Sequence, residues 1–142
     1  MGVQGKAEAR LIDIAVACCT ALSAQQSEML VRTRDAIAQL PGTVVHDLLA
    51  DFPSRDQFSR LIQAEAFESA AIRMLGSKLG YMASRSPEGL HLVTVIAPGV
   101  EELALSADTL ALALAAGLLT AIEIYANGGG RVSDPDAVLR LN

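Results

Sequence analysis

Aromatic residues are scarce in this sequence. Tryptophan is absent, and Phe, Tyr and Trp together make up 4% of the 142 residues. Large aromatic side chains anchor many ligand pockets and interface hot spots, and they stack on bases and sugars. Their scarcity argues against a site that binds its ligand by stacking.

Charged residues are also few. Asp, Glu, Lys and Arg make up 19% of the chain, below the average of about 25% for soluble domains. The formal net charge is −5, and no run of basic residues occurs. Binding to nucleic acid or to an anionic membrane needs clustered lysine and arginine. We therefore expect neither nucleic acid nor a membrane as a partner.

Residues with metal-binding or redox chemistry are rare. The two cysteines, Cys18 and Cys19, are adjacent within a helical pattern, where neighbouring side chains diverge, so we predict neither a disulfide nor a metal clip. Of the two histidines, His46 and His91, the first lacks a second ligand one helical turn later, because position 50 is Ala. The sequence has no G-x-S-x-G elbow and no S-x-x-K motif. We predict no metal site, no cofactor and no catalytic residue.

Length and hydropathy indicate one folded domain. The chain has 142 residues and a hydrophobic fraction of 51%, which suits a single domain with one core. Its first ten residues, MGVQGKAEAR, do not lead into the apolar region and cleavage site of a signal peptide, so we expect a cytoplasmic protein. The apolar run between Asp108 and Glu123 is shorter than the roughly 20 residues needed to span a membrane. It is expected to form a buried helix.

The first half of the sequence predicts helices over residues 6–76. Residues 6–22 carry their polar side chains on one narrow stripe, which is typical of a helix buried on most of its circumference. Ser23-Ala-Gln-Gln26 matches a capping box, which would begin a second helix that runs to about residue 40. Apolar residues nevertheless keep a common seven-residue register through this region, so one long, bent helix remains an alternative.

Further helices are predicted between residues 43 and 76. The segment 43–52 is short enough to be strand or helix, and Thr43 as a cap favours a brief helix. Ser54-Arg-Asp-Gln57 is a second capping box. The apolar residues behind it predict one helix of about twenty residues that ends near Gly76.

A period of two replaces the helical period between residues 80 and 107. Three alternating runs, 81–86, 90–97 and 101–107, predict an antiparallel three-stranded meander. The first two runs are joined by Pro-Glu-Gly, which suits a type I turn.

The last helix is predicted over residues 108–126, with Asp108 as its cap and three glycines after it. Together these elements predict an α+β fold of N-terminal helices, an antiparallel three-stranded β meander and a buried C-terminal helix. The expected single domain, 1–142, divides into a helical part, the meander, the last helix and a tail, at about 6–76, 80–107, 108–126 and 127–142.

The last helix is apolar on two of its own sides. Leucines occupy one side, and small residues form a strip on the other: Ala113, Ala116, Gly117 and Thr120. Because a three-stranded meander offers little cover, we expect a second copy of the chain to pack against this strip. The sequence thus predicts a homodimer. A monomer whose small-residue strip faces water is the alternative.

Three polar residues of the meander form a candidate ligand site: His91, Arg85 and Tyr81. Such residues on a small sheet can hold a carboxylate or phosphate group, so a small molecule or another protein is a further expected partner. We expect Ser84 to lie opposite His91 in the hairpin, which sends Arg85 and Tyr81 to the other face of the sheet. The three residues would then converge only between two chains.

VVHDLLADFPSRDQFSRLI, residues 44–62, resembles the junction that closes the DNA-binding head of tetracycline-repressor-type regulators: a helix, a Phe-Pro-Ser-basic-acidic turn and the next helix. The resemblance covers about a seventh of the chain. It implies an all-helical transcription regulator with a degenerate helix-turn-helix. His46, Asp47 and Asp51 stand where that family has a basic recognition helix.

These observations favour three classes of function, in this order. The first is a non-enzymatic homodimeric module that binds an unknown ligand or protein, because apolar surface is abundant and polar clusters are missing. The second is a small enzyme whose site is shared across a dimer interface, with His91 and Arg85 from different chains. The third is the transcription regulator that the resemblance implies.

Overall fold

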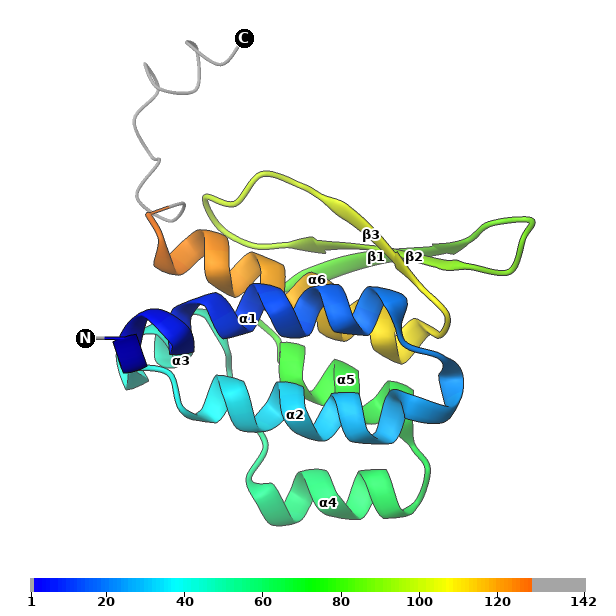
Figure 1. The fold of residues 1–142 in the computed structure, drawn as a ribbon, viewed down its shortest axis with the longest axis horizontal. Helices are drawn as coiled ribbons and strands as arrows, with labels where there is room; N and C mark the ends of the chain where they lie inside the picture. The colour runs from blue at the N-terminus through cyan, green and yellow to red at the C-terminus, as the bar shows by residue number, and fades with distance from the viewer. Residues whose placement is uncertain (1, 129–142) are drawn as a thin grey trace, which may run out of the picture.

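The computed structural model describes residues 2–128, with side chains from residue 11 onward except at 44 and 45. Six α-helices, one short 3-10 helix and a three-stranded antiparallel sheet make up this part of the chain (Figure 1). The α+β class is confirmed. Of the predicted tail, 127–142, residues 129–142 lie outside the described residues. The elements are α1 Gly2–Thr20, η1 Ser23–Gln25, α2 Gln26–Ala38, α3 Gly42–Leu48, α4 Arg55–Gln63, α5 Phe67–Leu75, β1 Gly80–Arg85, β2 His91–Ile96, β3 Ala104–Ala107 and α6 Leu110–Ala126.

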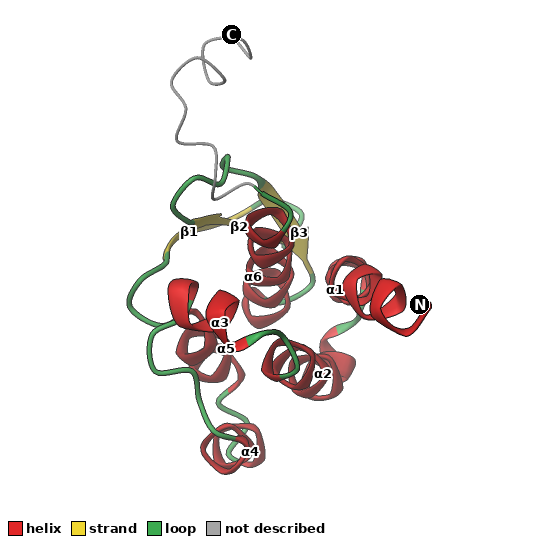
Figure 2. Cartoon of the chain, turned by 90° about the vertical axis from the view of Figure 1, so that its left-hand side faces the viewer, coloured by secondary structure: helices red, strands yellow, loops and turns green. Residues whose placement is uncertain are grey.

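Helix α6 lies at the centre of the fold. The sheet, in the order β1-β2-β3, covers one side of it, and α1, α2 and α5 pack around the other sides (Figure 2). Helix α4 lies outside this group and contacts α5. The prediction of a buried C-terminal helix is confirmed: eleven of the seventeen residues of α6 are buried.

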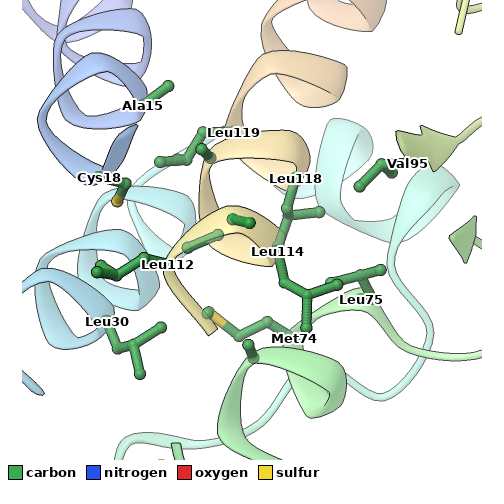
Figure 3. Packing of buried hydrophobic residues seen from close by; sticks show 14 of the residues in the cluster. Ala15, Cys18, Leu30, Met74, Leu75, Val95, Leu112, Leu114, Leu118 and Leu119 are labelled. Atoms are coloured by element: carbon green, nitrogen blue, oxygen red, sulfur yellow. The ribbon is translucent and has the colours of Figure 1, made fainter. Parts of the chain in front are cut away.

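Leucines of α6 fill the space between it and the other helices. Figure 3 shows Leu119 pointing toward α1, Leu112 toward α2 and Leu114 toward α5. All three are fully buried. Because they come from one helix and contact three others, a single hydrophobic cluster joins the whole helical part of the chain.

The remaining side of α6 faces the sheet. A Cβ added at Gly117 would lie 2.7 Å from Cγ2 of Val95 and 3.6 Å from Cγ1 of Val93. The missing side chain therefore lets the helix and β2 approach closely. Ala113 and Ala116 are also fully buried, and the fourth member of the strip, Thr120, is half-buried.

The chain thus covers its own small-residue strip. A second copy could reach Ala113, Ala116 or Gly117 only if the packing around α6 opened. The premise from which the dimer was predicted, that one chain leaves a flank of this helix without cover, is wrong. The dimer itself stays a prediction, and its contact has to lie elsewhere on the surface.

Residues 6–40 form two helices rather than one. Helix α1 ends at Thr20, and the chain turns through η1 into α2. The capping contact is shifted by one residue from the predicted box: the backbone N–H of Leu22 donates to Oε1 of Gln25 at 2.9 Å. The segment 43–52 does form a brief helix, α3, but this helix begins at Gly42, so Thr43 lies within it and does not cap it as predicted.

The predicted helix of about twenty residues after Ser54 is in fact two, α4 and α5. The capping box at Ser54 is confirmed. The break comes at Glu65, which has a φ of 58°. There the N–H of Ala66 donates to Leu61 O and the N–H of Glu65 donates to Ile62 O, the two bonds of a Schellman motif. Since glycine usually occupies this left-handed position, a glutamate gives little sequence signal for the break.

The start of α6 also differs from the prediction. Thr109, not Asp108, caps the helix, and its hydroxyl accepts from the N–H of Leu112 at 3.1 Å. Asp108 instead accepts a hydrogen bond of 2.7 Å from the backbone N–H of Ser23. This bond ties the start of α6 to the corner between α1 and α2.

Substitution of Gly117 tests how closely α6 and β2 pack. Gly117→Ala should lower the free energy of unfolding by about 1 kcal/mol, because overpacking against the stiff Val95 side chain outweighs the helix propensity that alanine adds. In a Val95→Ala background the clash is absent, and the same substitution should raise the free energy of unfolding by up to about 1 kcal/mol. Urea unfolding of the four proteins measures both changes. Equal effects in the two backgrounds would show that helix and strand are not in contact here.

Candidate functional site

The β1–β2 hairpin has a different register from the one expected. Arg85 lies opposite His91, and Ser84 lies opposite Leu92. The cause is a three-residue loop: the N–H of Ser86 donates to Leu90 O at 2.9 Å, and the loop glycine has a φ of 92°. Such a loop adds one residue to a two-residue turn, and a shift of one residue exchanges the two faces of a strand.

This register places the three candidate ligand residues on one face of the sheet, the face toward the helices. Arg85 and His91 are direct cross-strand neighbours. Tyr81 lies opposite Val95, four residues from Arg85 along β1, which is about 13 Å in a strand. The expectation that Arg85 and His91 could meet only between two chains is therefore wrong, whereas Tyr81 of the same chain lies too far away to join them.

A surface cavity of about 430 Å³ lies beside His91. The first residues of α2, α5 and α6 also line it, so three helices point their N-terminal ends at the same space (Figure 1). Their partial positive charges are offset by two carboxylates, Glu65 and Glu68, which lie on the wall of the cavity. No cluster of three or more metal-binding side chains occurs in the described part of the chain. Of the residues that line this cavity, only His91 was predicted from the sequence as a site residue.

The outer edge of β1 is open. All six of its residues are exposed, and the strand lies to one side of α6 (Figure 2). In an antiparallel ladder, alternate residues direct their N–H and C=O groups to one neighbour and the others away from it. Because the N–H of Ser86 bonds to Leu90 O, the groups of Tyr81, Ala83 and Arg85 point away from β2. The strand therefore presents a row of free backbone donors and acceptors.

The face of the sheet that points away from the helices carries exposed apolar side chains and has no cover among the described elements. Met82 is 56% exposed and Ile96 is 38% exposed. The structure encloses only the face toward α6.

The adjacent cysteines are free thiols. Cys18 is fully buried next to Thr33, with Sγ 3.8 Å from Oγ1. The Thr33 hydroxyl donates to the carbonyl of Met29 at 2.8 Å, so its oxygen is left to accept from the thiol. Burial raises the pKa of Cys18 to about 11 and also raises the pKa of Cys19. A buried, protonated thiol is not a nucleophile, and Cys18 belongs to the core rather than to a reactive site.

Comparisons with protein-family models, with curated proteins and with solved structures find no match to this chain. The class it belongs to is defined by its architecture, an α+β domain in which a three-stranded meander lies over a central helix. The all-helical fold implied by the resemblance of residues 44–62 does not include such a sheet. None of the described helices combines the length and the hydropathy required to cross a membrane.

The Cys18 thiol should make the folded state less stable at high pH. Its pKa is raised from 9.0 to about 11 in the folded state, so between these values the unfolded chain loses a proton that the folded chain keeps. The stabilisation is complete below the lower value and is lost as the pH rises through the higher one. From about pH 8 to about pH 10, the free energy of unfolding of Cys18→Ala should fall by about 1 kcal/mol less than that of the wild type. Urea titrations at both pH values test this, and identical pH dependence of the two proteins would contradict it.

Proposed function

We propose that the chain is a non-enzymatic interaction module of the cytoplasm that works as a homodimer, and that two copies join through strand β1. The observation that carries the proposal is the open edge of this strand. Its free N–H and C=O groups belong to Tyr81, Ala83 and Arg85. A second extended strand can bond to them and lengthen the sheet.

Strand β1 lacks most of the features that commonly prevent edge pairing. Natural edge strands carry proline, a bulge or an inward-pointing charge. Gly80–Arg85 contains no proline, pairs with β2 without a bulge, and has its only charged residue at its end. The opposite edge, β3, is four residues long and contacts α1. Of the two edges, β1 is therefore the one that can accept another strand.

A two-fold axis at Ala83 pairs all the free groups of this edge. Most homodimers have a two-fold axis, so the same surface meets itself. With the axis at Ala83, this residue pairs with its own copy, and Tyr81 pairs with Arg85 of the second copy. Every free N–H and C=O group of the three residues then has a partner, and the two Arg85 charges lie at opposite ends of the joined strands.

Neighbouring registers are less favourable. An axis at Met82 would place Arg85 opposite Leu79. Because Leu79 precedes the strand, Arg85 would then have no residue of β1 as its partner. An axis at Ser84 would place Tyr81 opposite Pro87, which has no N–H to donate. The Ala83 register joins the two sheets into one, with the helices of both copies on the same side.

The exposed apolar face supports the same pairing. In the Ala83 register Met82 lies next to Ser84 of the second copy, on the face away from the helices. Its side chain is 56% exposed in the single chain, and the second copy would cover one flank of it. Burial of apolar surface then adds to the backbone hydrogen bonds.

Ala83→Pro separates dimer formation from folding. Proline here removes only an N–H that points to solvent in the single chain, where an edge strand tolerates it. We expect this variant to keep the circular dichroism spectrum of the wild type and to become monomeric. Ala83→Thr, which keeps the N–H and suits a strand, should stay dimeric.

Light scattering measures the outcome. The monomer has a mass of 14.9 kDa, and the dimer has twice that mass. A monomeric wild type at micromolar concentration, or a dimeric Ala83→Pro variant, would refute the proposed contact.

A further inference from the structure

We infer that the dimer binds a small carboxylate at each end of its joined β1 strands, on Arg85 and His91 of one copy and Tyr81 of the other. The inference rests on the proposed dimer, because one chain alone does not bring the three residues together.

Arg85 and His91 form the part of the site that each chain already contains. They are cross-strand neighbours on the face toward the helices. Arg85 is exposed and His91 is half-buried. The only ion pair among the described residues joins Arg34 and Asp35, so the Arg85 guanidinium has no carboxylate partner in that part of the chain. Its planar group of donors suits a carboxylate, which accepts two parallel hydrogen bonds from it.

The second copy supplies Tyr81. In the Ala83 register Tyr81 lies directly opposite Arg85, on the strand that follows it in the joined sheet. Residues paired in this way share a face, so the phenol also points toward the helices. Neighbouring strands are about 4.8 Å apart, and the row from His91 through Arg85 to the second Tyr81 therefore spans about 10 Å. Its imidazole, guanidinium and phenol groups can donate to the same anion.

The surroundings favour a carboxylate over a phosphate. The cavity beside His91 has a volume of about 430 Å³ and is lined by Glu65 and Glu68. These two carboxylates repel a doubly charged phosphate more strongly than a singly charged carboxylate. They also favour a ligand whose remaining part, in the cavity, is neutral or positively charged. The volume suits a small molecule.

Mixing two variants that each bind acetate weakly tests whether the site is shared. Arg85→Gln and Tyr81→Phe should each weaken acetate binding about tenfold or more, since each removes one donor from both sites of the homodimer. In a mixed dimer, one site lacks both groups, and the other keeps Arg85 and His91 from one copy and Tyr81 from the other. Unfolding and refolding the two variants together should therefore restore about one quarter of the wild-type number of sites. Acetate titrations followed by NMR shifts of the His91 ring measure binding.

A matched control and a second ligand complete the experiment. Arg55→Gln removes an exposed arginine of α4. This helix lies outside the group around α6 and away from the sheet, so the substitution should leave acetate binding unchanged. Titration with inorganic phosphate should show weaker binding than acetate.

The outcomes distinguish the inference from the proposed function. Dimeric proteins that bind no acetate, or a mixture that restores no binding, would overturn the shared site and leave the dimer intact. Tighter binding of phosphate than of acetate would overturn the assignment of the ligand as a carboxylate. A monomeric wild type in light scattering would overturn the dimer and the shared site together.

Discussion

Helix α6 and strand β2 approach so closely at Gly117 that a Cβ there would lie 2.7 Å from Val95. This contact fixes the sheet over the helix. The other sides of α6 pack on α1, α2 and α5, so each of these elements takes its position from the same helix. The composition is suited to this arrangement, because alanine and glycine allow backbones to approach where aromatic side chains would hold them apart. A small chain can therefore enclose a strongly apolar helix without a second subunit.

Because β2 packs on α6, strand β1 lies to one side of this helix and is not packed against it. Val93 and Val95 of β2 are buried against the helix, whereas every residue of β1 is exposed. The same packing that completes the core thus produces an open sheet edge to one side of it (Figure 2). In the proposed dimer that edge becomes the middle of a larger sheet. The surface available for association is then set by the position of β2, and it is not the small-residue strip of α6.

Periodicity in the sequence predicted most of the fold, whereas details that depend on single residues were missed. The apolar run of α6 and the alternation between residues 80 and 107 span many residues, so their signals are strong. The break between α4 and α5 depends on Glu65 in a conformation that glycine usually occupies. Thr109 and Asp108 are both good caps, and only the position of Ser23 in space decides which one caps α6.

In the candidate site, His91, Arg85 and Tyr81 were all named from the sequence. The sheet faces on which they were predicted to lie were wrong, because the hairpin register depends on the loop. Glu65 and Glu68 reach the cavity through a turn that the sequence did not reveal.

The loop Pro87-Glu-Gly89 has a consequence for how this protein can change over evolutionary time. If insertion or deletion of one residue there shifted the pairing of β1 with β2 by one position, Arg85 would lie on the side of the sheet away from His91. A shift of two positions would preserve their common face. Variation in the length of this loop should therefore be tolerated only where the loop takes up the change and the pairing of Arg85 with His91 is kept, even though the loop itself lies at the surface.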